Sequence, residues 1–327
     1  MSPESVLLSF FSLLLLLAVT VAGGRDPCDP TTLPDPRSLR SDQLTVLING
    51  YAESRIPLLR SIAAAYSASP SVASIVVLWG NPSTPSQTLA QLSRNLSATA
   101  SAAPISVLRQ RSDSLNSRFF PRPSIATRAV LICDDDVEID AKSVDFAFRV
   151  WNSNRNRLVG FFARSHDFDL ASRSWIYTVH PDKYSIVLTK FMITRTESLY
   201  QYSCGGGRPM AEARAKVDQM RNCEDILMNF VAAEEASAGP ILVAAERARD
   251  WGDPRNEGRR EGVREAGLSS RRSYHRKRRG DCIREFHRIL GKMPLRYSYG
   301  KVVDSVGEQG LCWKAGKLVL CDRQLPA

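Results

Sequence analysis

The sequence predicts a mixed α/β domain with a largely parallel central sheet. Short runs rich in β-branched and other apolar residues recur at residues 44–48, 75–79, 105–108 and 129–133. Helical patterns separate the first three runs, at residues 56–66 and 87–96. Strands that alternate with helices at this spacing pair in parallel. With 327 residues, 43% of them hydrophobic, the chain can bury a large core of this kind.

The first 24 residues are predicted to direct the chain into the secretory pathway. Residues 6–22 contain only apolar residues, serine and threonine, and as a helix they would be about 25 Å long, slightly short of a hydrocarbon core about 30 Å thick. This length fits a cleaved signal peptide or a short signal anchor. Residues 25–42, rich in Pro and Asp, are expected to form an irregular stem before a single catalytic domain at 43–327. Asn95 begins an N-glycosylation signal suited to that pathway.

Seven cysteines also agree with an oxidising compartment. Cys133 lies inside an apolar run, and we expect it to remain a free thiol. Cys312 and Cys321 flank a predicted hairpin, where they can form a local bridge. Cys28 and Cys204 have no partner that the sequence alone identifies.

Three consecutive carboxylates, Asp134, Asp135 and Asp136, follow the apolar run at 129–133. In α/β sheets, ligands bind beyond the carboxyl ends of the strands. Neighbouring carboxylates about 5 Å apart repel by roughly 3 kcal/mol at an effective dielectric of about 20, and a divalent cation would remove this penalty. Oxygen ligands suit Mg²⁺ or Mn²⁺, which commonly complete their shells with substrate phosphates. A solvated acidic turn explains the three acids alone equally well.

Two further charged segments lie in the C-terminal half. Asn222 is expected to cap a helix whose first turn contains Glu224 and Asp225. The helix dipole would stabilise these acids by about 0.3 to 1 kcal/mol without any catalytic role. Residues 271–279 hold six basic residues and His275. In a secretory protein this run indicates a solvated face or a surface that binds the diphosphate of a nucleotide sugar, and not a nucleic-acid site.

Three motifs follow one another in a specific order. They are the segment DSLNSRF at 113–119, the triple aspartate, and the segment NCEDILMNF at 222–230. Together they resemble glycosyltransferase family 64, the exostosin-like C-terminal transferases, over residues 43–302. Within that family, three more segments look closest to the plant glycosylinositol phosphorylceramide mannosyltransferases, at residues 179–185, 250–253 and 310–312.

The resemblance implies a GT-A nucleotide-diphospho-sugar transferase fold and a retaining transferase. It gives Asp136 the direct contact to Mn²⁺, with Mg²⁺ as the alternative, and Asp225 the main catalytic role beside the donor sugar. It also implies a disulfide between Cys223 and Cys282. The residues that it assigns to the nucleotide sugar are Asn49, Arg55, Asn81, Asp113, Arg118, Asp134, Asp135 and Arg279.

The function that the resemblance implies is transfer of mannose from GDP-mannose to a glycosylated inositol phosphoceramide. The enzyme would act at the Golgi membrane with its catalytic domain in the lumen. A transferase of the same fold that uses a UDP-N-acetylhexosamine donor is one alternative. Another is a non-enzymatic basic secretory protein that binds acidic glycans or lipid headgroups through residues 271–279. Asp136 would be dispensable for such a binding protein.

Overall fold

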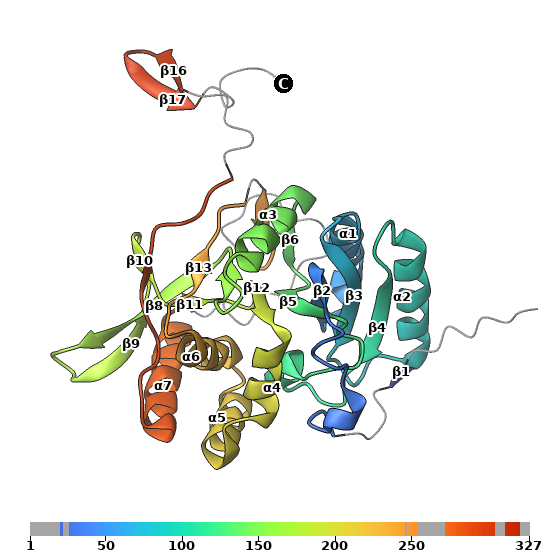
Figure 1. Ribbon diagram of the computed structural model, residues 1–327, viewed down its shortest axis with the longest axis horizontal. Helices are drawn as coiled ribbons and strands as arrows, with labels where there is room; N and C mark the ends of the chain where they lie inside the picture. Colours follow the sequence, from blue (N-terminus) through green and yellow to red (C-terminus); the bar gives the residue numbers. More distant parts are fainter. Residues whose placement is uncertain (1–19, 22–25, 246, 254–271, 305–310, 321–327) are drawn as a thin grey trace, which may run out of the picture.

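The computed structural model describes residues 20–21, 26–245, 247–253, 272–304 and 311–320. Its centre is an eight-stranded sheet with the strand order β1-β4-β3-β2-β5-β12-β7-β13 (Figure 1). Of the predicted signal segment, only Thr20–Val21 is described, as the short strand β1 at one edge of the sheet. None of the helices in the described ranges has the length and apolar character needed to span a membrane.

Four neighbouring strands of the sheet run parallel and contain the apolar runs seen in the sequence. They are β4 (Ile105–Arg109), β3 (Val72–Trp79), β2 (Arg40–Gly50) and β5 (Thr127–Asp134). Beyond β5, two antiparallel pairings join β12 (Phe191–Arg195) and β7 (Val159–Gly160), and β13 (Ile241–Leu242) runs parallel to β7. The predicted mixed, largely parallel sheet is therefore confirmed.

Helices cover both faces of the sheet, because alternate side chains of each strand point to opposite sides. Leu44, Val46 and Ile48 of β2 enter one core cluster, and Leu47 enters the other. The first cluster includes α1 (Ile56–Ser67), α2 (Ser86–Thr99) and α3 (Ala141–Asn152). The second includes α4 (Thr196–Cys204), α5 (Gly207–Met220), α6 (Glu224–Ala236) and α7 (Arg272–Leu290).

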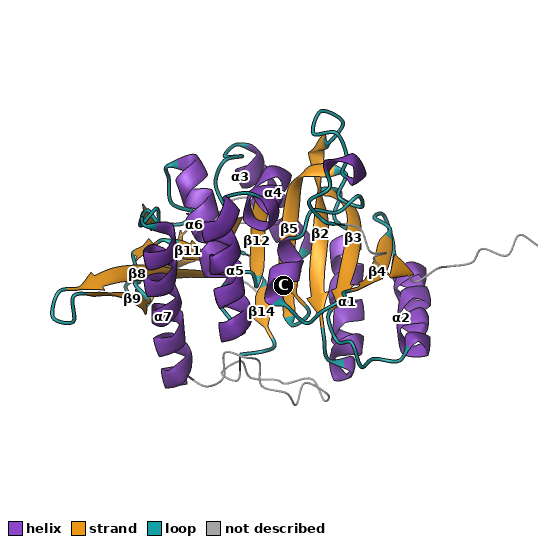
Figure 2. Ribbon diagram, turned by 90° about the horizontal axis from the view of Figure 1, so that it is seen from below, coloured by secondary structure: helices purple, strands orange, loops and turns teal. Residues whose placement is uncertain are grey.

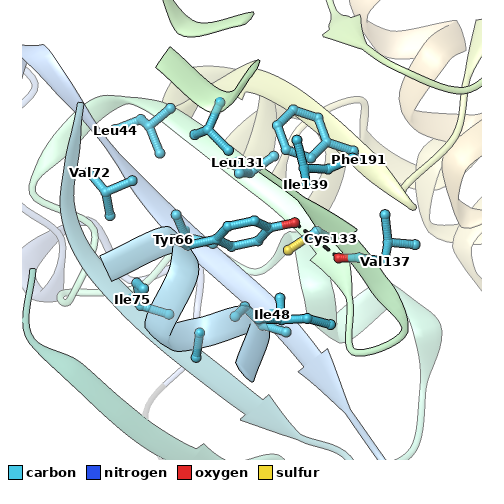
Figure 3. Close-up of a cluster of buried hydrophobic side chains, with 14 of the residues drawn as sticks. Leu44, Ile48, Tyr66, Val72, Ile75, Leu131, Cys133, Val137, Ile139 and Phe191 are labelled. Atoms are coloured by element: carbon cyan, nitrogen blue, oxygen red, sulfur yellow. Dashed lines mark hydrogen bonds between the residues drawn. The ribbon is translucent and has the colours of Figure 1, made fainter. Parts of the chain in front are cut away.

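The first core cluster includes Cys133 and Val137, the residues on either side of the triple aspartate. Tyr66 of α1 is fully buried there, and its hydroxyl donates a hydrogen bond of 3.0 Å to the carbonyl of Val137 (Figure 3). Cys133 lies beside this ring as a buried free thiol, as predicted. The contact ties α1 to β6 (Val137–Ile139), the strand that follows the three acids.

Several small elements surround the main sheet. The hairpin of β8 (Ala163–Asp169) and β9 (Ser174–Thr178) extends away from it (Figures 1 and 2). The remaining strand pairs are β11 (Ile186–Val187) with β8, β10 (Lys183–Tyr184) with β15 (Ser298–Tyr299), and β14 (Ala248–Asp250) with β6. The predicted C-terminal hairpin is present as β16 (Leu311–Lys314) and β17 (Lys317–Leu320). Its proposed bridge involves Cys321, which lies outside the described residues.

The segment expected to form an irregular stem contains turns and one short 3-10 helix over residues 26–39, whereas residues 40–42 already belong to β2. Cys28 forms a disulfide with Cys204 at the end of α4. Residues Pro30–Thr32 form a 3-10 helix, η1, and the side chain of its N-cap residue Asp29 accepts a hydrogen bond from the backbone of Thr31. A covalent link and local turns hold this segment, so a search for apolar patterns does not detect it.

Candidate active site

The triple aspartate lies at the carboxyl end of β5, in the middle of the sheet. Asp134 is the register partner of Asn49, the penultimate residue of the neighbouring strand β2. Asn49 Nδ2 donates a 2.9 Å hydrogen bond to the carbonyl of Cys133, and its own carbonyl accepts one from the backbone of Asp135. The structure therefore brings Asn49 next to the acids, as the resemblance implies.

Arg55 joins two of the three acids. It belongs to η2 (Glu53–Arg55), the turn that precedes α1, and its Nη1 lies 3.0 Å from a carboxylate oxygen of Asp135 and 3.0 Å from one of Asp136. Burial raises the pKa of Asp135 to about 6 although Arg55 opposes the rise. Burial also raises the pKa of Asp136, against Arg55 and Lys190. For both acids, the effect of burial on the pKa therefore outweighs the attraction of these cations.

A short loop covers Asp136. The backbone of Trp251 donates a 2.8 Å hydrogen bond to the carbonyl of Asp136, and a Cβ atom at Gly252 would overlap the Asp136 carboxylate. Asp250, at the start of this loop, forms an ion pair with Lys190. From the sequence we found only a family resemblance in this loop and gave its residues no role. A glycine in such a loop can indicate that the backbone passes close to another group.

The start of α6 differs from the prediction. Cys223, and not Asn222, is the N-cap residue; its φ is 79°, and its side chain makes no capping hydrogen bond. Cys223 forms a disulfide with Cys282 of α7, the pairing that the resemblance implies. Asn222 Oδ1 instead accepts a 3.1 Å hydrogen bond from Arg279. The proposed cap at Asn222 is therefore wrong, because the disulfide sets the backbone at this point and the amide is used by an arginine from α7.

Asp225 and Arg279 form a buried ion pair. Arg279 Nη2 lies 2.6 Å from Asp225 Oδ2, and the two side chains are 6% and 4% exposed. The guanidinium also lies over the ring of Tyr177, 4.6 Å from its centroid. Burial opposes the charge on Arg279, but Asp225 and Tyr177 more than compensate and raise its pKa. The second oxygen of Asp225 accepts the backbone N–H of Ile226 at 2.8 Å.

Arg118 connects the triple aspartate to the first turn of α6. This residue of η3 (Leu115–Phe119) lies 3.2 Å from Asp134 and 3.0 Å from Glu224, and it donates a 2.8 Å hydrogen bond to Thr189. Burial raises the pKa of Asp134 to about 7, against the charge of Arg118. Burial also raises the pKa of Glu224, again against Arg118, while Asp225 adds to the rise. From the sequence we expected Glu224 only to be stabilised by the helix dipole. In the structure, Arg118 links it to Asp134 of the triple aspartate.

Other predicted site residues lie further from this cluster. Asn81, which follows β3, accepts a 2.9 Å hydrogen bond from the backbone of Ser83. Asp113 forms a surface ion pair with Arg221. No hydrogen bond or ion pair that the structure describes joins Asn81 or Asp113 to the three acids. Asn95 lies half-buried within α2, and its glycosylation remains a prediction.

The residues around Asp136 fit a hard divalent cation. Within the parts of the chain that the structure describes, no three His, Cys, Asp or Glu side chains converge as a complete metal site. Mg²⁺ and Mn²⁺ do not need one, since one or two carboxylates and the phosphates of a substrate commonly complete their coordination. Asp136 offers oxygen donors, and its buried charge is shared with Arg55. Asp136 as a metal ligand therefore remains a prediction, since the other ligands would have to come from a substrate.

An α/β sheet whose carboxyl edge gathers buried acids and arginines defines a class of enzymes that bind charged ligands at this edge. The chain belongs to glycosyltransferase family 64: the glycosyl transferase family 64 domain matches residues 44–307. The protein is therefore a glycosyltransferase, and the exostosin-like resemblance is confirmed.

Three relatives show how similar the chain is to known proteins and how much of each chain the similarity covers. The protein is 66% identical over 310 residues to glycosyltransferase family protein 64 C3 of Arabidopsis thaliana, covering 94% of both chains. It is 34% identical over 255 residues to exostosin-1 of Mus musculus, covering 74% of this chain and 30% of that one. It is 30% identical over 277 residues to glucosamine inositolphosphorylceramide transferase 1 of Arabidopsis thaliana, covering 82% and 33%. The matches thus span about a third of the two longer relatives.

Proposed function

We propose that the protein is a retaining, metal-dependent transferase of the GT-A fold that moves mannose from GDP-mannose to glycosylinositol phosphorylceramide. The observation that carries this proposal is the buried Asp225–Arg279 pair, which Arg118 and Glu224 link to the triple aspartate. One charged network would then supply both a carboxylate for the sugar and cations for a diphosphate. The name of the glucosamine inositolphosphorylceramide transferase supports an acceptor of this lipid class.

The donor would lie along the carboxyl edge of the sheet. Asp134 and Asp135 would contact the ribose and the sugar. The other residues proposed to bind the nucleotide sugar are Asn49, Arg55, Asn81, Asp113 and Arg118. Arg55 and Arg118 already fix the acids through ion pairs, so the acidic groups are oriented before the donor binds.

Asp136 is the residue that would hold Mn²⁺, or Mg²⁺ in its place. When bound, the cation supplies positive charge that stabilises a departing diphosphate more than an intact donor. Arg279 would bind the same diphosphate through its planar donors. Asp225 would face the anomeric carbon, where positive charge develops, as a nucleophile or as an electrostatic stabiliser.

The setting in the cell follows from the N-terminal segment. A signal peptide or anchor at residues 1–24 would carry the domain into the secretory pathway. The proposed location is the Golgi membrane, with the acceptor lipid presented at the luminal surface. The predicted stem at 25–42 would lie against the catalytic domain at 43–327, because a disulfide joins Cys28 to Cys204 of that domain.

A second candidate keeps the same site but uses a UDP-N-acetylhexosamine donor. It is favoured by the 30% identity to a relative named for glucosamine transfer to inositol phosphorylceramide. The two candidates differ in the donor base and sugar, and the same residues are proposed to bind either donor. Membership of a transferase family leaves the purely non-enzymatic binding protein without support.

One experiment tests both donors. The purified protein is incubated with GDP-mannose, UDP-N-acetylglucosamine and other nucleotide sugars in the presence of Mn²⁺, and the released nucleotide diphosphate is measured. We expect release from GDP-mannose, and loss of release in the variant Asp136→Asn or in excess chelator. Asp42→Asn is the matched control, since Asp42 pairs with Arg40 on the surface, where its side chain is 67% exposed. Preferred release from a UDP-sugar would favour the second candidate, and full activity of Asp136→Asn would remove the metal from the mechanism.

A further inference from the structure

A cavity lies on the side of β8 and β10, near the loop that covers Asp136. Its volume of about 460 Å³ is in the range of about 300 to 1,000 Å³ that small-ligand sites occupy. The side chains that define its chemistry are Phe161, Phe162, Arg164, His180, Tyr184 and Lys301. None of these residues was assigned a role from the sequence.

Lys190 connects the cavity to the loop that covers the triple aspartate. Lys190 lies 6.0 Å above the ring of Phe162, and it also pairs with Asp250 in the loop over the triple aspartate. The carbonyl of Phe162 accepts a 2.9 Å hydrogen bond from Leu188. On the other side, Arg164 lies in β8 two residues before His166, the register partner of Tyr177, whose ring Arg279 covers.

The charges in the cavity favour an anion. Within the described ranges, the one hydrogen bond that the side chain of Arg164 donates goes to the carbonyl of Ala163, at 2.7 Å, and no described carboxylate pairs with this guanidinium. A guanidinium has five N–H donors, and its planar fork matches a carboxylate or a phosphate. Lys301 adds an exposed ammonium, whereas Asp182 is the one acid of the lining.

The aromatic side chains favour a sugar ring next to that anion. Phe161 packs against Phe191, with ring centroids 4.4 Å apart, so its position is fixed from the core side. The hydroxyl of Tyr184 accepts a 2.9 Å hydrogen bond from the backbone of Leu242. Phe162 completes an apolar lining of fixed rings. Apolar walls with a few placed polar groups are typical of sites for small amphipathic ligands.

We propose that this cavity binds an anionic group of the acceptor glycan, a phosphate or a carboxylate, with Arg164 as its main partner. The assignment rests on the proposed transferase function, because it takes the neighbouring acid site as the donor site. It makes Arg164 and Lys301 residues that determine acceptor specificity.

Binding of three small probes to the full chain tests the assignment. The probes are inositol 1-phosphate, methyl glucuronide and the neutral methyl glucoside, each titrated by calorimetry. We expect at least one anionic probe to bind about tenfold or more tightly than the neutral one. The tighter of the two anionic probes tells whether the group is a phosphate or a carboxylate.

Substitutions locate the binding. Arg164→Gln should weaken the preferred anionic probe about tenfold, and the surface variant Lys301→Gln should weaken it less. Arg94→Gln is the matched control, since Arg94 is an exposed arginine of α2, at the end of the molecule opposite β8 (Figures 1 and 2). It should bind all three probes as the wild type does.

The outcomes separate this assignment from the proposed function. Equal affinity for the three probes, or wild-type affinity in Arg164→Gln, would overturn the cavity assignment even if the enzyme releases nucleotide diphosphate from a donor. Selective binding that depends on Arg164, in a protein that turns over no nucleotide sugar, would support an acidic-glycan site and overturn the transferase proposal.

Discussion

Replacing Asp225 by Asn should lower the stability of the protein as well as its activity. The carboxylate lies 2.6 Å from Arg279, and the two side chains are only 4% and 6% exposed. Asparagine keeps the shape of the side chain but leaves the guanidinium buried without its counter-charge. Removing one partner of a buried ion pair costs about 3 to 5 kcal/mol, compared with about 1 kcal/mol or less for a carboxylate that serves only a helix dipole.

The expected loss can be converted to a change in melting temperature. At about 2.1 cal/mol/K per residue, a chain of 327 residues has an unfolding entropy of about 0.7 kcal/mol/K, so the midpoint should fall by about 4 to 7 °C. Calorimetric melting of the two proteins measures it. Glu212→Gln is a control with the same chemical change, because Glu212 and Arg288 form an exposed pair with side chains 52% and 60% exposed. Its midpoint should stay within about 1 °C of the wild type.

Activity separates catalysis from structure. If Asp225 stabilises charge at the anomeric carbon, Asp225→Asn should lower kcat about a hundredfold, equivalent to roughly 2.7 kcal/mol, below the melting transition and with little change in donor affinity. The double variant Asp225→Leu/Arg279→Met should regain much of the stability, since no unpaired charge remains, without regaining transfer. An unchanged midpoint together with a wild-type kcat in Asp225→Asn would refute both parts of the reasoning.

Three further predictions concern other parts of the molecule. Gly252→Ala should lower transfer at least tenfold, because its Cβ would displace the Asp136 carboxylate. Gly280→Ala is the control: an added Cβ has only ordinary contacts from 3.5 Å there, so the variant should melt no lower than the wild type. Burial lowers the pKa of His166 to about 4, so at this residue the unfolded chain binds more protons below pH 6.5. The stability of the wild type relative to His166→Gln should therefore fall by about 2 kcal/mol between neutral pH and pH 5, measured by denaturant unfolding of both proteins at each pH. Replacing Cys223 and Cys282 by Ser should cost about 4 kcal/mol in denaturant unfolding, given their separation of 59 residues.

The parallel half of the sheet could be predicted from the sequence because each of its strands is a continuous apolar run. Residues 129–133, for example, are buried on both faces, and such strands carry no polar alternation to obscure them. The short strands β7, β10, β11 and β13 have two residues each and were not predicted. Their pairing depends on neighbours far along the chain, which leave no local pattern.

The site shows the same division between local and distant signals. Three adjacent acids mark the end of β5 in the sequence itself. The pairing of Arg118 with Glu224 joins residues from η3 and α6, and no spacing rule connects them. The cap at Asn222 was predicted wrongly because the rule considers only local hydrogen bonds, whereas here a disulfide and Arg279 decide the start of α6.

Two arginines converge on the first turn of α6, and we therefore expect stability and activity to depend on the same contacts. Arg118 arrives from the segment before β5 and Arg279 from α7, and they pair with the consecutive residues Glu224 and Asp225. Each charge would be costly to bury alone, so each pair fixes the orientation of its acid. Fixed acids need no reorganisation when charge develops on a substrate, which is the main electrostatic contribution of an enzyme to catalysis. In the proposed transferase, the disulfide from Cys223 to α7 therefore belongs to the catalytic arrangement, because it holds the helix that carries Arg279 against the helix that carries Asp225.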